Sequence, residues 1–275
     1  MAEDGPRRGP RPVVTRDGRR SRPRARASGA SRASGASRAI GARSGDGLPE
    51  AGDEEHVARR IQRGYGAWAR VYDWFARATA SVGGVRAGCV RALDLDPGDT
   101  VVEFGCGPGV NVPALREAVG PTGRVVGVDI TGAMLDRARG LAERRGGENV
   151  EFVRGDATDP PVRSADAVLA TFVTSLFPDP YAVVSDWCGL ADKVVVAAFA
   201  PRGSRPANAA LAGFARLNGR LFDLNADDTL DRLDARTTAA RRALADNTRT
   251  LTEERYLFGT ITAYAGHGSA GDRDG

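Results

Sequence analysis

A run of glycines and one acidic residue, VVEFGCGPG over 101–109, holds the residue types best suited to bind a ligand. Its first half is apolar enough for a buried strand. Gly105, Gly107 and Gly109 then allow a tight turn with positive φ and let the backbone approach a ligand closely. The helix expected after this turn would present free N–H groups at its amino end. Such loops bind several kinds of nucleotide, so further residues must identify the ligand.

The residues in and around this loop argue against two common ligand types. A dinucleotide fold requires G-x-G-x-x-G, but the pattern here is G-x-G-x-G and position 110 is Val. A phosphate-binding loop requires a Lys after its last Gly, and the only Lys in the chain is Lys193. Glu103 would repel a pyrophosphate, whereas it would attract an ammonium or a sulfonium group.

Two more carboxylates follow the next two apolar runs. Asp129 ends RVVGVD, and Asp156 follows NVEFVRG, with Ala157 beside it. Each alone is typical of a solvated strand end or a helix cap. Together with Glu103 they end three successive strands at one rim of a sheet, where Asp129 could accept ribose hydroxyls and Asp156 an adenine amino group. The three positions therefore favour a shared nucleoside site.

Alternating apolar and amphipathic segments predict the fold. The apolar runs predict buried strands, and the segments between them predict helices as crossovers. We therefore expect an α/β fold with a doubly wound, mostly parallel, Rossmann-like sheet and a closing antiparallel strand. The expected strands are 100–104, 124–129, 150–154, 166–171, 193–199, 250–256 and 260–265, and the expected helices are 110–119, 132–145, a short one near 158–163, 180–190 and a region over 205–246.

The chain divides into a basic tail and a mildly acidic body. Residues 1–45 are rich in Arg, Gly, Ser and Ala and hold 12 of the 39 basic residues but only 3 of the 35 acidic ones. This tail has too few apolar side chains to form a core, so we expect it to be disordered. Residues 46–268 are expected to form one domain, with a lid helix over 54–80, a cofactor-binding core over 97–200, acceptor-side helices over 201–246 and closing strands over 249–266.

Cysteine and histidine usage limits the remaining chemistry. The three cysteines are widely spaced, which provides no disulfide framework or metal pair, and only two histidines occur, His56 and His267. We therefore expect no metal site and a reducing, cytoplasmic location. No apolar run approaches the length of a membrane span. The basic pI belongs to the tail, so it does not predict a nucleic-acid partner for the body.

Four segments in order resemble motifs I to IV of the class I S-adenosylmethionine-dependent methyltransferases: LDLDPGDTVVEFGCGPG, GPTGRVVGVDITGAMLDRAR, VEFVRGDATDPP and ADAVLATFVTSLFPDP. The upstream YGAWARVYDWF resembles the segment before motif I in quinone and phospholipid methyltransferases of the methyltransferase-11 type. The resemblance implies S-adenosylmethionine as cofactor. Its implied contacts are Glu103, Gly105, Cys106, Gly107 and Gly109 around the methionine and ribose, Asp129 on the ribose, Ile130, Met134, Asp156 and Ala157 around the adenine, Thr171 under the sulfonium, and Tyr65 and Tyr72 in a lid.

The resemblance leaves the acceptor open. The segment TFVTSLFPDP lacks the [DN]PP[YF] pattern of enzymes that methylate nitrogens in DNA and proteins. Several aromatic residues in the second half favour a small, apolar acceptor such as a quinone precursor or a lipid amine, although they are equally typical of core packing: Phe172, Phe177, Tyr181, Trp187, Phe199, Phe214 and Phe222. No catalytic base is identified, and the oligomeric state is left open. The alternatives are an RNA methyltransferase recruited by the tail, a non-catalytic adenosylmethionine-binding partner subunit, and an NAD-dependent oxidoreductase.

Overall fold

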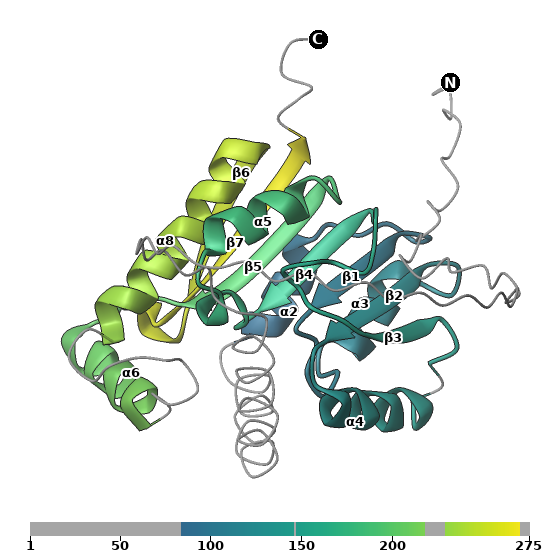
Figure 1. Ribbon diagram of the computed structural model, residues 1–275, viewed down its shortest axis with the longest axis horizontal. Coiled ribbons are helices and arrows are strands. Elements are labelled where there is room, and N and C mark those ends of the chain that lie inside the picture. Colours follow the sequence, from purple (N-terminus) through teal and green to yellow (C-terminus); the bar gives the residue numbers. More distant parts are fainter. Residues whose placement is uncertain (1–83, 146, 218–228, 270–275) are drawn as a thin grey trace, which may run out of the picture.

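The computed structural model of the chain describes residues 84–145, 147–217 and 229–269. Within these ranges the chain forms an α/β fold around one seven-stranded sheet (Figure 1). The predicted tail 1–45 and the predicted lid helix 54–80, with Tyr65 and Tyr72, lie outside the described residues.

The sheet is mostly parallel and has the strand order β3-β2-β1-β4-β5-β7-β6. β7 runs antiparallel to both of its neighbours, and the other pairings are parallel, which confirms the predicted doubly wound sheet with a closing antiparallel strand. The strands are β1 (Thr100–Phe104), β2 (Arg124–Asp129), β3 (Val150–Arg154), β4 (Ala167–Thr171), β5 (Lys193–Phe199), β6 (Thr248–Tyr256) and β7 (Ile261–Ser269).

Continuous apolar runs form the central strands because both faces of the sheet are covered. All residues of β1 and β4 are buried. Successive side chains point to opposite faces, so Val101 joins one hydrophobic core and Val102 the other.

Helices cover the sheet on its two faces (Figure 1). The first core includes side chains from α2 and α3, and the second includes side chains from α5 and α8, which pack against each other. α4 packs against β2 and β3. No helix in the described ranges is both long and apolar enough to cross a membrane. The helices are α2 (Val85–Ala92), α3 (Val112–Val119), α4 (Gly132–Glu143), α5 (Pro180–Cys188), α6 (Arg205–Leu217) and α8 (Thr229–Asn247).

One helix prediction is wrong, and one helix was missed. No helix forms near 158–163, where the chain makes turns and an isolated bridge joins Asp156 to Asp159. Pro160 and Pro161 explain this, because proline lacks an N–H group and disfavours helical geometry at the residue before it. Helix α2 was not predicted, although Val85, Cys89 and Leu93 recur every four residues and are fully buried. The helical region predicted over 205–246 contains two helices, α6 and α8, and residues 218–228 between them lie outside the described ranges.

The aromatic residues expected to cluster on the acceptor side lie on opposite faces of the sheet. The Trp187 ring stacks on Phe104 at 4.9 Å between ring centroids and meets Phe177 edge-on at 5.8 Å, within the second core. Phe172 and Phe199 pack together at 4.9 Å in the first core. These four of the predicted residues are therefore core aromatics. Tyr181 is partly buried and donates its hydroxyl to Asp246 on α8, and the Phe214 and Phe222 side chains lie outside the described part.

Candidate cofactor site

The candidate site lies where the strand order reverses. From β1 the chain proceeds outward to β2 and β3, and then returns to β4 on the other side of β1. In open α/β sheets, ligands bind outside the carboxyl ends of the strands at this point. Glu103 lies near the carboxyl end of β1, Asp129 ends β2, and Thr171 ends β4. These strand ends form one half of the sheet's carboxyl edge, and we call it the cofactor half because the sequence predicts the cofactor contacts there.

The glycine loop adopts the left-handed backbone that its sequence predicts. Gly105, Gly107 and Gly109 have φ values of 65°, 54° and 79°. A Cβ atom at Gly109 would also lie 3.0 Å from the Cβ atom of Ala138 on α4, which is closer than ordinary packing allows. The loop therefore depends on glycine both for its turn and for its close contact with α4.

Asp129 connects the end of β2 to this loop. Its Oδ2 accepts a hydrogen bond from the Gly107 backbone N–H at 2.9 Å, and its Oδ1 accepts one from the Thr131 N–H at 2.8 Å. Burial raises the pKa of Asp129, and the two backbone N–H groups oppose that shift. A carboxylate oxygen can accept a second hydrogen bond, so both oxygens keep acceptor capacity for a ligand hydroxyl.

Glu103 is the most deeply buried acidic group of the edge. Its residue is only 1% exposed, its Oε1 accepts a hydrogen bond from Asn111 Nδ2 at 2.6 Å, and its Oε2 is buried without a partner. Burial raises the pKa of Glu103 to about 7, although the Asn111 hydrogen bond and the Arg86 charge lower it. A buried acceptor without a partner costs free energy, so this oxygen is a candidate ligand contact.

Asn111 occupies the N-cap position of α3 but does not cap the helix. Its side chain makes no capping hydrogen bond, and it lies among Glu103, Thr171 and Arg86 instead. Nδ2 donates to Glu103 and, at 3.2 Å, to Thr171 Oγ1, while Oδ1 accepts from Arg86 Nη1 at 3.0 Å. An N-cap hydrogen bond contributes about 1 kcal/mol, so the helix forgoes this stabilisation to build the polar cluster.

Arg86 reaches the same cluster from the first turn of α2. Its Nη1 also donates to Thr171 Oγ1 at 3.3 Å, and its guanidinium carbon lies 5.6 Å from the centre of the Phe172 ring. Phe172 has a φ of 64°, which is strained for a bulky residue, and it directly follows Thr171. Strained backbone often occurs at binding sites, where the surrounding structure holds it in place.

The residues after β3 do not join this cluster. Asp156 is exposed, and its Oδ1 accepts hydrogen bonds from the N–H and the hydroxyl of Thr158, both at 2.8 Å. The Ala157 carbonyl accepts a hydrogen bond from Trp187 Nε1 at 2.9 Å. Met134 is buried at the start of α4, whereas Ile130 is 44% exposed.

Cys106 is a packing residue of the loop. It is 5% exposed, and burial raises the pKa of its thiol well above the usual value. Burial also raises the pKa of Cys89 and Cys188 to about 12. Because the thiolate is the nucleophilic form, none of these thiols is suited to nucleophilic catalysis.

The histidine in the described ranges lies at the wrong edge of the sheet for catalysis. His267 pairs with Lys193, the first residue of β5, and its Nε2 lies 2.8 Å from the Ala92 carbonyl oxygen. It is therefore at the amino edge of the parallel strands. His56 lies outside the described residues.

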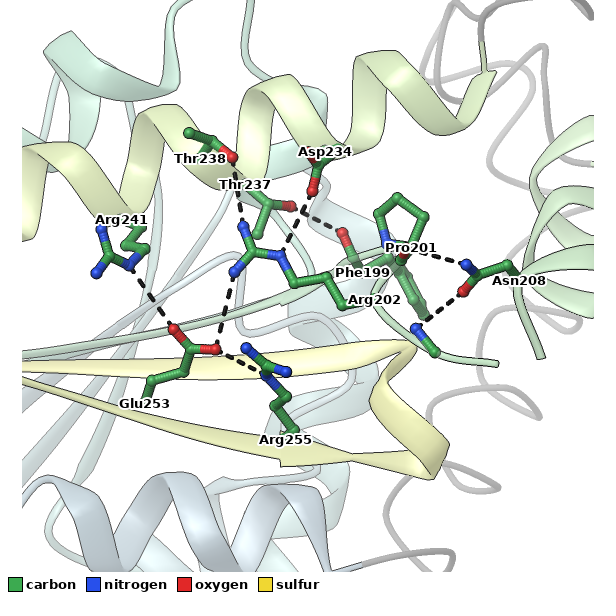
Figure 2. A network of polar contacts seen from close by, with 11 residues as sticks. Phe199, Pro201, Arg202, Asn208, Asp234, Thr237, Thr238, Arg241, Glu253 and Arg255 are labelled. Atoms are coloured by element: carbon green, nitrogen blue, oxygen red, sulfur yellow. Dashed lines mark hydrogen bonds and ion pairs between the residues drawn. The ribbon is translucent and has the colours of Figure 1, made fainter. Parts of the chain in front are cut away.

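The other half of the carboxyl edge consists of β5, β7, α8 and the loops between them, and we call it the acceptor half because the sequence predicts the acceptor on this side. Arg202, just after β5, binds Asp234 on α8 at 3.5 Å and Glu253 on β6 at 3.8 Å (Figure 2). Its Nη2 also lies 3.4 Å from the Thr238 hydroxyl, and Glu253 binds Arg241 as well. These partly exposed ion pairs join three segments that are distant in sequence.

Sequence reasoning missed Arg86 and Asn111. The helical spacing of Val85, Cys89 and Leu93 could have indicated α2 and therefore the face on which Arg86 stands. No local pattern indicates that Arg86 reaches Thr171, which lies 85 positions away.

Comparison with a family model and with curated proteins gives the same family. A family model described as "Methyltransferase domain" matches residues 101–190. The phosphatidylethanolamine N-methyltransferase of Cereibacter sphaeroides is 32% identical over 182 residues, which cover 64% of this chain and 85% of that protein. The chain belongs to the class I S-adenosylmethionine-dependent methyltransferases.

Further relatives support this membership over a smaller part of their length. The nocamycin O-methyltransferase of Saccharothrix syringae is 39% identical over 105 residues, 36% of this methyltransferase and 38% of that protein. The chain spans less than half of the length of several curated relatives. A Haloferax volcanii structure, titled as a complex of the Trm112 methyltransferase activator with a putative methyltransferase, shares the fold. It has a TM-score of 0.51 and 16% identity, and covers 76% of this chain and 97% of that one.

Membership in this family sets aside one of the alternative functions. The family uses S-adenosylmethionine, which sets aside the NAD-dependent oxidoreductase and agrees with the G-x-G-x-G spacing.

Proposed function

We propose that this methyltransferase transfers the methyl group of S-adenosylmethionine to a small apolar acceptor, either a lipid amine or a quinone precursor. The observation that supports an apolar acceptor most directly is the position of the exposed apolar side chains. In the described ranges, the exposed large hydrophobic side chains are Ile130, Leu176 and Phe258, with Phe258 87% exposed. Leu176 comes after β4 and Phe258 stands in the turn beside the end of β5, whereas Ile130 comes after β2 and is one of the residues proposed to contact the adenine.

The β6–β7 turn that holds Phe258 keeps a fixed place on this edge. Ala200 and Arg202 donate backbone hydrogen bonds to Thr260 and Gly259 at 3.0 and 3.2 Å. Leu257 and Phe258 both have positive φ values, 48° and 57°. An apolar side chain held outward in a strained turn is costly, which favours a role in contacting an apolar ligand.

The cofactor half fits S-adenosylmethionine. In the proposed arrangement the free Oε2 of Glu103 accepts a hydrogen bond from the methionine ammonium, and the loop of Gly105, Cys106, Gly107 and Gly109 passes beneath the ribose. Asp129 accepts the ribose hydroxyls, and Thr171 lies under the sulfonium. Further contacts to the adenine come from Ile130, Met134, Asp156 and Ala157, and Tyr65 and Tyr72 complete the site as part of a lid.

When bound, the cofactor supplies a methyl group on a positively charged sulfur. The protein then mainly needs to align the acceptor and exclude water, and such positioning can supply much of the rate. The described part of the edge offers no histidine for a general base, since His267 lies at the opposite edge. This favours an acceptor that is already nucleophilic, such as a neutral amine.

The relatives support the same acceptor class. One is named for phosphatidylethanolamine and one for nocamycin, and the chain covers 85% of the first. We further propose that residues 46–268 form the methyltransferase domain, with acceptor-side helices over 201–246.

Methyl transfer from radiolabelled S-adenosylmethionine tests the proposal. The full chain would be incubated separately with phosphatidylethanolamine vesicles, reduced quinone precursors, water-soluble amines and bulk RNA, with Asp129→Ala as a control that lacks the proposed ribose contact. We expect label in the organic extract of a lipid or quinol reaction and none with the control.

Other results would overturn the proposal in distinct ways. Label only in polar products would contradict the apolar acceptor. Label in RNA that is lost when residues 1–45 are removed would indicate an RNA methyltransferase. Cofactor binding without turnover until a second protein is added would indicate a partner subunit.

A further inference from the structure

The loop after β4 touches both the glycine loop and α8. Val173 packs against the glycine loop, because a Cβ atom at Gly105 would lie 2.8 Å from Val173 Cγ2. Further along, the Ser175 carbonyl accepts a hydrogen bond from Arg236 Nη1 of α8 at 2.5 Å. The loop after β4, with its single 3-10 turn Thr174–Leu176, therefore borders both the cofactor half and the acceptor half.

Two hydroxyl groups of this loop are buried without a hydrogen bond. Thr174 and Ser175 are each 1% exposed. Neither Thr174 Oγ1 nor Ser175 Oγ has a hydrogen-bond partner within the part of the chain that the structure describes. A buried hydroxyl without a partner costs free energy, and a ligand that bonds to it would offset that cost.

Arg236 adds a positive charge beside these two hydroxyls. Its side chain is partly exposed, so an anionic group can reach the guanidinium from water. A guanidinium has several N–H donors in a planar fork, so it can bind the Ser175 carbonyl and an anion at the same time. Rotation about one side-chain bond would turn each hydroxyl toward that anion. Phosphate is the anion that best fits an arginine with adjacent hydroxyl donors, because it accepts several hydrogen bonds at once.

We infer that Arg236, Thr174 and Ser175 bind the phosphate group of the acceptor, which is a phosphate ester of an amino alcohol with an apolar tail. This inference rests on the proposed function and deepens it, because it selects the lipid amine over the quinone precursor, which has no phosphate. Thr174 follows Thr171 by three positions, so their Cα atoms lie at most about 11 Å apart. Thr171 is the residue proposed under the sulfonium, so a short carbon link from the phosphate would bring the amine to the methyl group.

A purely structural role for Arg236 makes a different prediction. In that case Arg236 would only join α8 to the loop after β4, and its loss would weaken the use of every acceptor equally. A role in phosphate binding instead affects only those acceptors that carry a phosphate. Acceptors that differ in this group therefore separate the two roles.

The test measures kcat and KM for methyl transfer from S-adenosylmethionine in micelles of a neutral detergent that contains no phosphate. Two acceptors carry the phosphate, namely phosphatidylethanolamine and its water-soluble headgroup phosphoethanolamine. Two apolar acceptors lack it, namely sphingosine and a reduced quinone precursor.

The proteins are the full chain, Arg236→Met, Arg236→Lys, Thr174→Val and Arg232→Met. Arg232 is an exposed arginine one turn earlier on α8, so its variant controls for the loss of one positive charge from this helix. Thermal unfolding and calorimetric titration of S-adenosylmethionine check that each variant is folded and binds the cofactor.

We expect the full chain and Arg232→Met to prefer phosphatidylethanolamine over both acceptors without phosphate in kcat/KM. Arg236→Met should raise the KM for phosphatidylethanolamine about tenfold, because it removes hydrogen bonds to a charged group, and should leave the KM for sphingosine unchanged. Arg236→Lys keeps the charge but loses the planar fork, so its KM should fall between the two. Thr174→Val removes a buried hydroxyl without a partner, so it should raise the KM for phosphatidylethanolamine without lowering the temperature of unfolding.

An equal kcat/KM of the unaltered chain for phosphatidylethanolamine and for an acceptor without phosphate would overturn the inference and leave the proposed function standing. This comparison holds even if the Arg236 variants fail to fold. Equal increases in KM for all acceptors in Arg236→Met would overturn the inference as well. Methylation of phosphoethanolamine alone, weakened by Arg236→Met, would support the phosphate site but contradict the apolar acceptor. No methylation of any of the three apolar acceptors would contradict the proposed function itself.

Discussion

The cofactor half and the acceptor half of the carboxyl edge are stabilised in different ways. In the cofactor half, Glu103, Asn111 and Thr171 are at most 3% exposed and bind one another directly. In the acceptor half, Arg202 and Glu253 have side chains that are 24% and 25% exposed, and the ion pairs that join them to each other and to α8 are 3.5 Å or longer. The first arrangement is buried, whereas the second is partly exposed to water.

Because of this difference, the two halves should respond differently to substitution. Burying a polar group costs free energy, and only hydrogen bonds within a complete network or to a ligand offset that cost. We therefore expect the cofactor half to be specific to its ligand. Exposed ion pairs contribute little individually and tolerate substitution. We therefore expect changes in the cofactor half to alter cofactor affinity, and changes in the acceptor half to alter stability and acceptor use.

The largest expected effect is the loss of cofactor binding in Asp129→Asn. The asparagine amide would place an N–H group against the Gly107 or Thr131 N–H, which now donates to a carboxylate oxygen. Hydrogen bonds to charged groups contribute about 1.5–3 kcal/mol each, so we expect affinity for S-adenosylmethionine to fall about 100-fold. Calorimetric titration measures this. Asp136→Asn on the exposed face of α4 is the control and should leave affinity unchanged.

The next effect concerns the pH dependence of stability through Glu103. Burial raises its pKa from 4.5 to about 7, so the ligand-free fold is favoured while Glu103 is protonated. This contribution is fully present below pH 4.5 and is lost as pH rises through about 7. Glu103→Gln removes the loss, so its free energy of unfolding relative to the original chain should rise by about 2 kcal/mol between pH 5.5 and 8.5. Urea unfolding at both pH values measures the change, and a difference that does not vary with pH would contradict it.

The protonation of Glu103 should also change the affinity for the cofactor, and here the charged form is the favourable one. The charged carboxylate binds an ammonium group, so affinity for S-adenosylmethionine should weaken as pH falls below about 7. With that pKa, the dissociation constant should increase about tenfold from pH 8 to pH 6. Glu103→Gln should bind weakly at both pH values and show no such trend.

A smaller effect is expected from Arg202→Met in the acceptor half. It removes the ion pairs that join the end of β5 to α8 and β6 (Figure 2). We expect about 1–2 kcal/mol of lost stability, because several partly buried charges act together. The KM for the acceptor should rise while affinity for S-adenosylmethionine stays unchanged. Arg242→Met removes a pair with a 75% exposed arginine and should cost less than about 0.5 kcal/mol.

The smallest effect on stability is expected from Phe258→Ser. The side chain is 87% exposed, so its loss should change the free energy of unfolding by less than about 0.5 kcal/mol. The KM for an apolar acceptor should nevertheless rise several-fold. An unchanged KM would mean that the acceptor does not contact the β6–β7 turn.

The strands and the glycine loop could be predicted from the sequence because their causes are local. β1, β2, β3 and β5 match the predicted bounds, because each is a short apolar run bounded by turn residues, a pattern typical of a strand. Gly105, Gly107 and Gly109 occupy the positive φ values that their residue type allows. The turns near 158–163 also have a local cause, and the Pro160–Pro161 pair could have corrected the prediction of a short helix there.

The tertiary structure alone decided which distant side chains meet. Arg86 lies 25 residues from Asn111 and 85 from Thr171, and only the packing of α2 beside β4 and α3 brings them together. Asn111 has the residue type of a helix cap, yet buried charge draws its amide into the cluster instead. The aromatic residues separate because they come from different parts of the fold: Phe177 and Trp187, before and on α5, join the second core, whereas Phe172 and Phe199, at the ends of β4 and β5, join the first. The sequence by itself therefore determined the sheet and its glycine loop through local backbone demands, whereas contacts between charges far apart along the chain required the complete fold.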